Sequence, residues 1–200
     1  MTRKLYLMRH GETLFNTQGR VQGACDSPLT ENGRAQALLA KEYFVKEAIT
    51  FDAVYSSTQE RATDTAKLVS EQDAVTQLKG IKEMDFGTFE AQPEMLLPKF
   101  RPGAISFEDL LVPFGGEDIR DVGKRAKSTI DSVISTTNDR SLLMVSHGAT
   151  MWGLCLELDI TLPAGVGFSN CAICEFDIDE SDYRLRKLIL PTKDFQIYKF

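Results

Sequence analysis

The sequence predicts an α/β fold, a three-layer sandwich with a mostly parallel central sheet, helices on both faces and an antiparallel C-terminal edge. Strand and helix patterns alternate along most of the chain, which favours parallel neighbouring strands with helices between them. Two strand patterns joined by a short polar turn close the chain, as in a hairpin. Because the 200 residues contain no linker or repeat, we expect a single domain over residues 1–200.

The first half of the chain supplies strands separated by two helices. Apolar runs predict strands over Lys4–Met8 and Phe51–Ser56, and Val75–Met84 is predicted to be extended. An apolar stripe predicts a helix over Asn32–Glu47. The sequence Ser57–Glu60 has the spacing of a capping box, and it predicts a second helix that runs to about Gln72.

The second half begins with a long amphipathic helix predicted over Asp118–Thr136. A strand over Ser141–Ser146 and a short helix over Thr150–Leu158 follow. The closing hairpin is predicted from the strand patterns Ala172–Ile178 and Tyr183–Leu190, which flank the polar turn Asp179–Asp182.

Residues 91–117 differ from the rest of the chain, and we call them the cover segment. They contain four prolines, which prevent long regular structure, and three phenylalanines. A segment of this length inside a compact domain is either functional or mobile. We expect it to cover the carboxyl edge of the sheet.

Composition excludes several classes of protein. The net charge of −6 argues against a general nucleic-acid binder. No apolar run approaches the roughly 18 residues of a membrane span, and no leader pattern opens the chain, so we expect no membrane partner and a cytoplasmic protein. Cys171 and Cys174 have CxxC spacing, but they lie in a strand pattern that turns them to opposite faces; we expect four reduced thiols and no metal site.

The chain has only two histidines, and both follow an apolar strand pattern and precede a glycine. Ligands of open α/β sheets bind beyond the carboxyl ends of strands. The polar side chains predicted near such ends are Arg9, His10, Arg61, Glu83 and His147. Guanidinium groups match phosphate oxygens bidentately, so this set predicts a site for a phosphoryl group.

The same residues predict a reaction. A neutral imidazole is a nucleophile near pH 7, and its attack on phosphorus gives a phosphohistidine. A carboxylic acid can protonate the leaving oxygen, and arginines can neutralise the phosphoryl oxygens without a metal or cofactor. Alternatives stay open at this point: Arg61 could be a solvated helix residue, and Asp85, Glu90 and Glu94 compete with Glu83 as the acid.

Five motifs, in family order, resemble those of the histidine phosphatase superfamily, also called phosphoglycerate-mutase-like. They are Leu7–Thr13 with Asn16, Pro28–Gly33, Ser56–Ala66, Glu83–Gly87 and Val145–Gly148. One departure is Phe89-Glu90-Ala91, where the family usually has Trp-Glu-Gly.

The resemblance implies a role for each residue. His10 would be the phosphorylated nucleophile, and Glu83 would be the proton donor and then the base. The oxygens of the phosphoryl group would be held by Arg9, Arg61 and His147, and the phosphate pocket would be lined by Asn16 and the backbone of Gln22 and Gly23. Glu117 would be a structural cap.

Three functions follow from this resemblance. The first is a metal-independent phosphatase acting on small phosphorylated metabolites. The second is a phosphoglycerate mutase, which would need more cations than the cover segment offers. The third is a non-catalytic phosphate-binding or interaction module, which the complete set of reactive residues disfavours. The sequence defines neither the substrate nor the oligomeric state.

Overall fold

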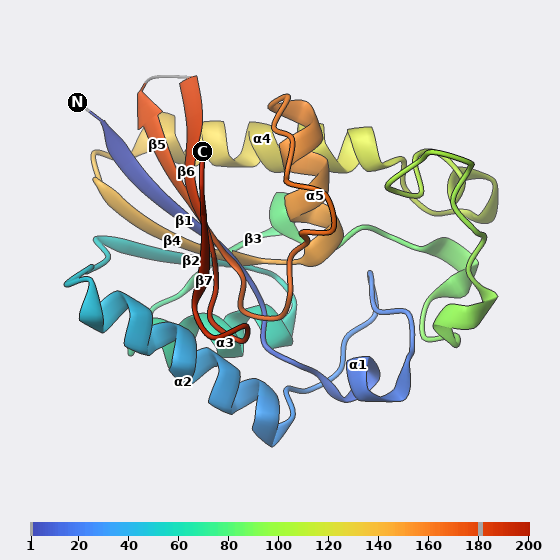
Figure 1. Cartoon of the computed structure of the whole chain (residues 1–200), viewed down its shortest axis with the longest axis horizontal. Coiled ribbons are helices and arrows are strands. Elements are labelled where there is room, and N and C mark those ends of the chain that lie inside the picture. The colour runs from blue at the N-terminus through green and yellow to red at the C-terminus, as the bar shows by residue number, and fades with distance from the viewer. Residues whose placement is uncertain (1, 180–181) are drawn as a thin grey trace.

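The computed structural model describes residues 2–179 and 182–200, and it is built on a seven-stranded sheet (Figure 1). In chain order the strands are β1 (Arg3–Arg9), β2 (Ala53–Ser57), β3 (Thr76–Leu78), β4 (Ser141–Ser146), β5 (Ile173–Asp179), β6 (Asp182–Leu190) and β7 (Gln196–Lys199). Their order across the sheet is β3-β2-β4-β1-β5-β6-β7. Strands β1 to β4 are parallel to one another, and β5, β6 and β7 extend the β1 edge by antiparallel pairing, which confirms the predicted fold class.

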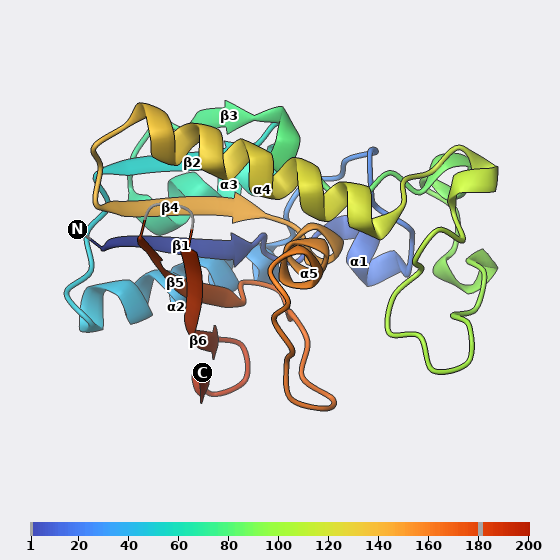
Figure 2. The same cartoon turned by 90° about the horizontal axis from the view of Figure 1, so that it is seen from above.

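Helices cover both faces of the sheet. On one side lie α2 (Glu31–Lys46) and α3 (Glu60–Ser70), and on the other α4 (Ile119–Thr136) and α5 (Gly148–Glu157) (Figures 1 and 2). Successive side chains of β1 explain the two layers, because Leu5 and Leu7 join the core with α4 and α5 whereas Tyr6 and Met8 join the core with α2 and α3.

The register of β1 and β4 brings the two histidines together. The strands are parallel, and Arg9 pairs with Ser146, so His10 and His147 leave the sheet side by side. The His10 amide donates to the Ser146 carbonyl at 3.1 Å. Both strands point toward α1 (Leu14–Gln18), α5 and the cover segment (Figure 2).

Helices α4 and α5 approach closely where two glycines meet. A Cβ atom on Gly123 of α4 would lie 2.2 Å from the carbonyl oxygen of Gly153 in α5. Only glycine allows this approach of two backbones. The contact fixes α5 against α4 and therefore fixes where the first turn of α5 stands at the sheet edge.

The extended stretch predicted over Val75–Met84 is wrong beyond its first residues. Only Thr76–Leu78 is a strand, and a 3₁₀ turn follows at Lys79–Ile81. The backbone there bonds to a side chain instead of a strand, since the Arg125 guanidinium donates to the carbonyls of Gly80, Lys82 and Glu83 at 2.8–3.0 Å. Strand β7 and helix α1, both short, were not predicted.

The predicted capping box before α3 is also wrong. Ser57 is the last residue of β2, and α3 begins at Glu60 after Gln59, which makes no side-chain cap bond. A residue from a distant loop serves instead, because Asp26 Oδ2 accepts from the Glu60 amide at 2.6 Å. The polar turn predicted over Asp179–Asp182 includes residues 180 and 181, which lie outside the described residues.

The cover segment has no regular structure longer than a 3₁₀ turn, as its prolines predict. Its first residues are tied to the loop after α1, with Val21 donating to the Gln92 carbonyl and Ala91 donating to the Val21 carbonyl. Its aromatic rings pack edge to face, at 4.7 Å between Phe100 and Phe107.

The remaining expectations concern thiols and membranes. All four cysteines are free thiols, and Cys171 and Cys174 contact the cores on opposite sides of the sheet. Among residues 2–179 and 182–200, no helix is long and apolar enough to cross a membrane.

Candidate active site

A cavity of about 700 Å³ opens at the carboxyl edge of the sheet, beneath the cover segment. Five residues predicted for the site line it: Arg9, His10, Asn16, Gln22 and Glu83. The cover segment contributes the opposite wall with Glu94, Met95, Leu97, Pro98, Lys99, Phe100 and Phe107. Arg61 and His147 do not line the cavity; both are fully buried and contact His10.

The hydrogen bonds of His10 define its tautomer. Its Nδ1 lies 2.7 Å from the Gly11 carbonyl, which can only accept, so Nδ1 carries the proton. Arg61 Nε donates to His10 Nε2 at 3.3 Å, so Nε2 carries a lone pair. Burial, followed by the charges of Arg61 and Arg9, lowers the pKa of His10 well below its usual value. The imidazole is therefore neutral, and Nε2 is its unprotonated nitrogen.

The Arg61 guanidinium forms hydrogen bonds and an ion pair with other groups of the protein in this structure. Its guanidinium donates to the carbonyls of Gln22, Gly23 and Cys25 at 3.0–3.4 Å, and it pairs with Asp26 at 2.7 Å. It is thus no solvated helix residue, since its side chain is 0% exposed. It holds the loop of residues 22–26 and keeps a positive charge against His10.

Two buried nitrogen atoms near His10 lack partners among the described residues. They are Arg9 Nε and His147 Nδ1. Another nitrogen of each side chain is engaged, with Arg9 Nη1 donating to the Phe168 carbonyl at 2.6 Å and His147 Nε2 lying 2.7 Å from Ser57 Oγ. The His147 ring stands 5.1 Å from that of His10. A buried unpaired donor costs about 1–3 kcal/mol, which a bound anion would remove.

Glu83 is held at the N-terminus of α5. Its Oε1 accepts from the amides of Met84 and Thr150 and from the Thr150 hydroxyl, at 2.9–3.1 Å. Its Oε2 accepts only a longer bond, from the Ala149 amide at 3.2 Å. Oε2 is therefore the oxygen with capacity left to carry a proton.

The three carboxylates that compete with Glu83 either accept other hydrogen bonds or are exposed. Glu90 accepts from the backbone amides of residues 23–25 and of Phe86. Asp85 accepts from the Gly87 amide at 2.8 Å, and Glu94 is exposed at the mouth of the cavity. Of the four acids, Glu83 alone is both buried and in the cavity wall.

One residue predicted for the phosphate pocket, Gly23, lies outside the lining of the cavity. Its amide donates to Glu90 at 3.1 Å and its carbonyl accepts from Arg61. Asn16 does line it, with Oδ1 accepting from the Thr13 amide. Ala91, which stands where the family usually has glycine, takes a left-handed conformation with φ of 61°.

Sequence reasoning missed two residues of the site, Ser57 and Gln59. Gln59 Oε1 accepts from the Glu83 amide at 2.9 Å, and its side-chain amide donates to the Gly23 carbonyl. The Gln59 backbone amide donates to Ser57 Oγ at 3.3 Å. Their position directly after an apolar strand pattern is typical of site residues. The capping-box spacing of Ser57–Glu60 instead predicted that they cap a helix.

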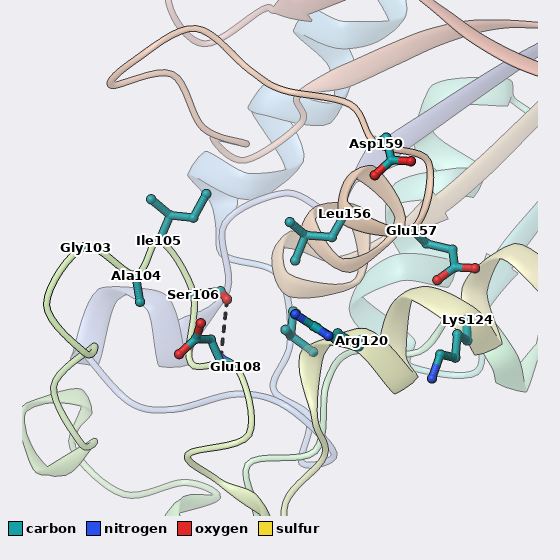
Figure 3. A pocket seen from close by; sticks show the side chains of 11 residues that line it. Gly103, Ala104, Ile105, Ser106, Glu108, Arg120, Lys124, Leu156, Glu157 and Asp159 are labelled. Carbon is teal, nitrogen blue, oxygen red and sulfur yellow. Dashed lines mark hydrogen bonds between the residues drawn. The ribbon is translucent and has the colours of Figure 1, made fainter.

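A second hollow of about 580 Å³ lies between the cover segment and helices α4 and α5 (Figure 3). Its charged side chains have both signs, with Arg120 and Lys124 on α4 and Glu108, Glu157 and Asp159 around them. None of the predicted site residues lines it. Within the described part of the chain, no group of three or more His, Cys, Asp or Glu side chains could hold a metal ion.

Comparisons with known proteins agree with this geometry. Residues 5–190 match the family model of the histidine phosphatase superfamily (branch 1). The chain is 32% identical, over 90% of its length and 87% of the relative's, to "Probable phosphoglycerate mutase GpmB" of Yersinia pestis (strain Pestoides F).

Two solved structures are similar over most of their length. One is a phosphoglycerate mutase from Bacillus anthracis, with 28% identity, a TM-score of 0.77 and 92% of each chain covered. The other is a phosphoserine phosphatase from Entamoeba histolytica in complex with 3-phosphoglyceric acid, with 29% identity, a TM-score of 0.74, and 92% of this chain and 95% of that one covered.

Proposed function

The chain belongs to the histidine phosphatase superfamily, and from this premise we propose that it hydrolyses small phosphate monoesters through a phosphohistidine on His10. One observation carries the proposal. The unprotonated Nε2 of a neutral imidazole lies beside Arg61 and near two buried nitrogens, on Arg9 and His147, that lack partners among the described residues.

The phosphoryl group of the substrate binds against these donors. Arg9 Nε and His147 Nδ1 each donate to a phosphoryl oxygen, which ends their unpaired state. Arg61 Nε moves its bond from His10 Nε2 to the entering group, so the lone pair becomes free. Guanidinium charge neutralises the oxygens, and the proposal therefore needs no metal.

The first step transfers the phosphoryl group to the protein. His10 Nε2 attacks phosphorus, the bond from phosphorus to the leaving oxygen breaks, and Glu83 Oε2 gives its proton to that oxygen. In the second step the Glu83 carboxylate removes a proton from water as the water oxygen attacks phosphorus. The phosphorus–nitrogen bond then breaks, which restores His10 and releases phosphate.

The leaving group lies against the cover segment. Phe86, Phe100 and Phe107 form an edge-to-face aromatic wall with ring separations of 4.7–5.8 Å. Arg20 and Lys99 also line the cavity and supply positive charge at its far side. We propose that the substrates are small monoesters whose leaving group has an apolar surface.

A second candidate is phosphoglycerate mutase activity, which the 32% identical relative named a probable mutase favours. A mutase must retain a bisphosphorylated intermediate, so it needs cations for a second phosphate and a carboxylate. Beyond the floor of the cavity, Arg20 and Lys99 are the cations that line it within the described residues. This small number favours hydrolysis.

The deciding experiment is a panel of phosphomonoesters that includes 3-phosphoglycerate, scored for both free phosphate and 2-phosphoglycerate. We expect phosphate release, and an acid-labile phosphoprotein on brief quenching. The variant His10→Ala should fold, form no phosphoprotein and lose turnover by about 10⁴-fold or more. Isomer formation without net phosphate release would instead establish the mutase, and full activity of His10→Ala would exclude the covalent mechanism.

A further inference from the structure

We propose that Ser57 fixes the tautomer of His147, so that Nδ1 carries the ring proton and is the atom that donates to the phosphoryl group. Ser57 is then a positioning residue that acts through His147. The catalytic consequence rests on the proposed function, whereas the tautomer itself does not.

The Ser57 hydroxyl has a single hydrogen-bond acceptor among the described residues, His147 Nε2. Ser57 is 0% exposed at the end of β2, beside the end of β4 from which His147 follows. Its Oγ accepts from the Gln59 amide at 3.3 Å and lies 2.7 Å from His147 Nε2. Within the described residues this hydroxyl makes no other hydrogen bond, so its proton is placed toward Nε2.

This bond determines where the imidazole proton resides. A ring nitrogen that accepts a hydrogen bond carries no proton, so a neutral ring with Nε2 as acceptor has its proton on Nδ1. The ring is neutral because burial, followed by the charge of Arg61, lowers the pKa of His147 well below its usual value. The two histidines of the chain then share the Nδ1-protonated form, which is the less stable tautomer of free histidine.

The opposite tautomer would fit the site poorly. With the proton on Nε2, the Ser57 hydroxyl would accept from the ring and its own proton would have no partner in a buried position. Nδ1, which is buried and without a partner among the described residues, would present a lone pair toward phosphoryl oxygens. Two lone pairs repel, so the site would lose a donor and gain an unfavourable contact.

The test uses the fact that the chain has two histidines. In protein labelled with ¹⁵N-histidine, long-range ¹H–¹⁵N spectra show four ring nitrogens, and protonated and unprotonated nitrogens differ widely in chemical shift. His10→Ala assigns the His147 signals. We expect Nδ1 of His147 to be protonated and Nε2 to be unprotonated in the unsubstituted protein. A protonated Nε2 would overturn the proposal.

Variants test the role of the hydroxyl. In Ser57→Ala, His147 should move toward the Nε2-protonated form while His10 is unchanged, and Ser57→Thr should keep the original pattern. The matched control is Ser56→Ala, since Ser56 is also 0% exposed but bonds to Thr63 and to the Ser57 carbonyl. Unchanged His147 shifts in folded Ser57→Ala would refute the proposal. If that variant does not fold, the spectrum of the unsubstituted protein still decides the tautomer.

Kinetics measure the consequence. Removal of groups that orient a reacting side chain typically costs about 10–100-fold in activity, and we expect this loss in kcat for Ser57→Ala, with recovery in Ser57→Thr. Failure of the proposed function can be distinguished from failure of the positioning role of Ser57. A protein that hydrolyses no monoester but shows the Nδ1-protonated ring would contradict the proposed function alone, whereas normal kcat in Ser57→Ala would contradict the positioning role.

Discussion

The two sides of the cavity are built differently. The floor is formed by Arg9, His10 and Glu83, and the fully buried Arg61 and His147 lie against His10. These side chains are held by hydrogen bonds to the surrounding protein. The wall formed by the cover segment has few such bonds and exposes apolar side chains, with Met95 at 89% and Phe100 at 45%. The floor has the order that group transfer requires, and the cover has the tolerance that recognition of varied leaving groups requires.

The largest effect that separates the two sides is expected for Glu83→Gln on the floor. An amide cannot donate a proton to the leaving oxygen, so kcat/KM for alkyl phosphates should fall by about 10²–10⁴-fold. p-Nitrophenyl phosphate, whose phenolate leaves without a proton, should be affected far less. Glu94→Gln is the control, because Glu94 lines the cavity but is exposed. Equal losses on both substrates would mean that another group supplies the proton.

Backbone packing behind the floor should be the next most sensitive feature. Gly123→Ala places a Cβ against the Gly153 carbonyl, and we expect the free energy of unfolding to fall by about 1–3 kcal/mol, measured with urea. Gly167→Ala is the control, since a Cβ there meets nothing within 4 Å. Equal stability of the two variants would show that α4 and α5 can separate without cost.

A smaller effect, on recognition alone, is expected in the cover segment. Phe107→Ala removes the ring between Phe86 and Phe100 and should raise KM for aromatic monoesters by about tenfold, or about 1.4 kcal/mol. Inhibition by inorganic phosphate should not change. Phe114→Ala, in the same segment but not in the cavity wall, should leave both constants unaltered. A change in phosphate inhibition would show that the cover also shapes the floor.

The smallest expected change is the response of the floor to pH. Because burial lowers the pKa of both histidines, their ¹⁵N signals should not titrate between pH 8 and pH 6.5, whereas free histidine is half protonated at about pH 6.5. The unfolded chain binds those protons first, so the free energy of unfolding should decrease as pH falls below about 6.5. A titration midpoint near 6.5 for either ring would show that the floor is open to water.

The sequence was sufficient to place site residues together where their positions follow from parallel strands of one sheet. His10 and His147 could be placed together because parallel strands deliver their next residues to one edge, and the structure places them on paired neighbours. Local patterns failed where a distant group competes. Ser57 looked like a helix cap, but Asp26 takes that position and the serine bonds to His147. The resemblance implied that the Gly23 backbone lines the phosphate pocket, but in the structure the Gly23 amide donates to the Glu90 carboxylate.

The first turn of α5 connects two side chains of the candidate site, Glu83 and His147. His147 immediately precedes the helix, and the amides of Ala149 and Thr150 hold Glu83. A displacement of this turn therefore acts on Glu83, the proposed proton donor, and on His147 together. Because helix amides hold the carboxylate, substitutions in the cover segment can alter substrate range while these two side chains keep their common support.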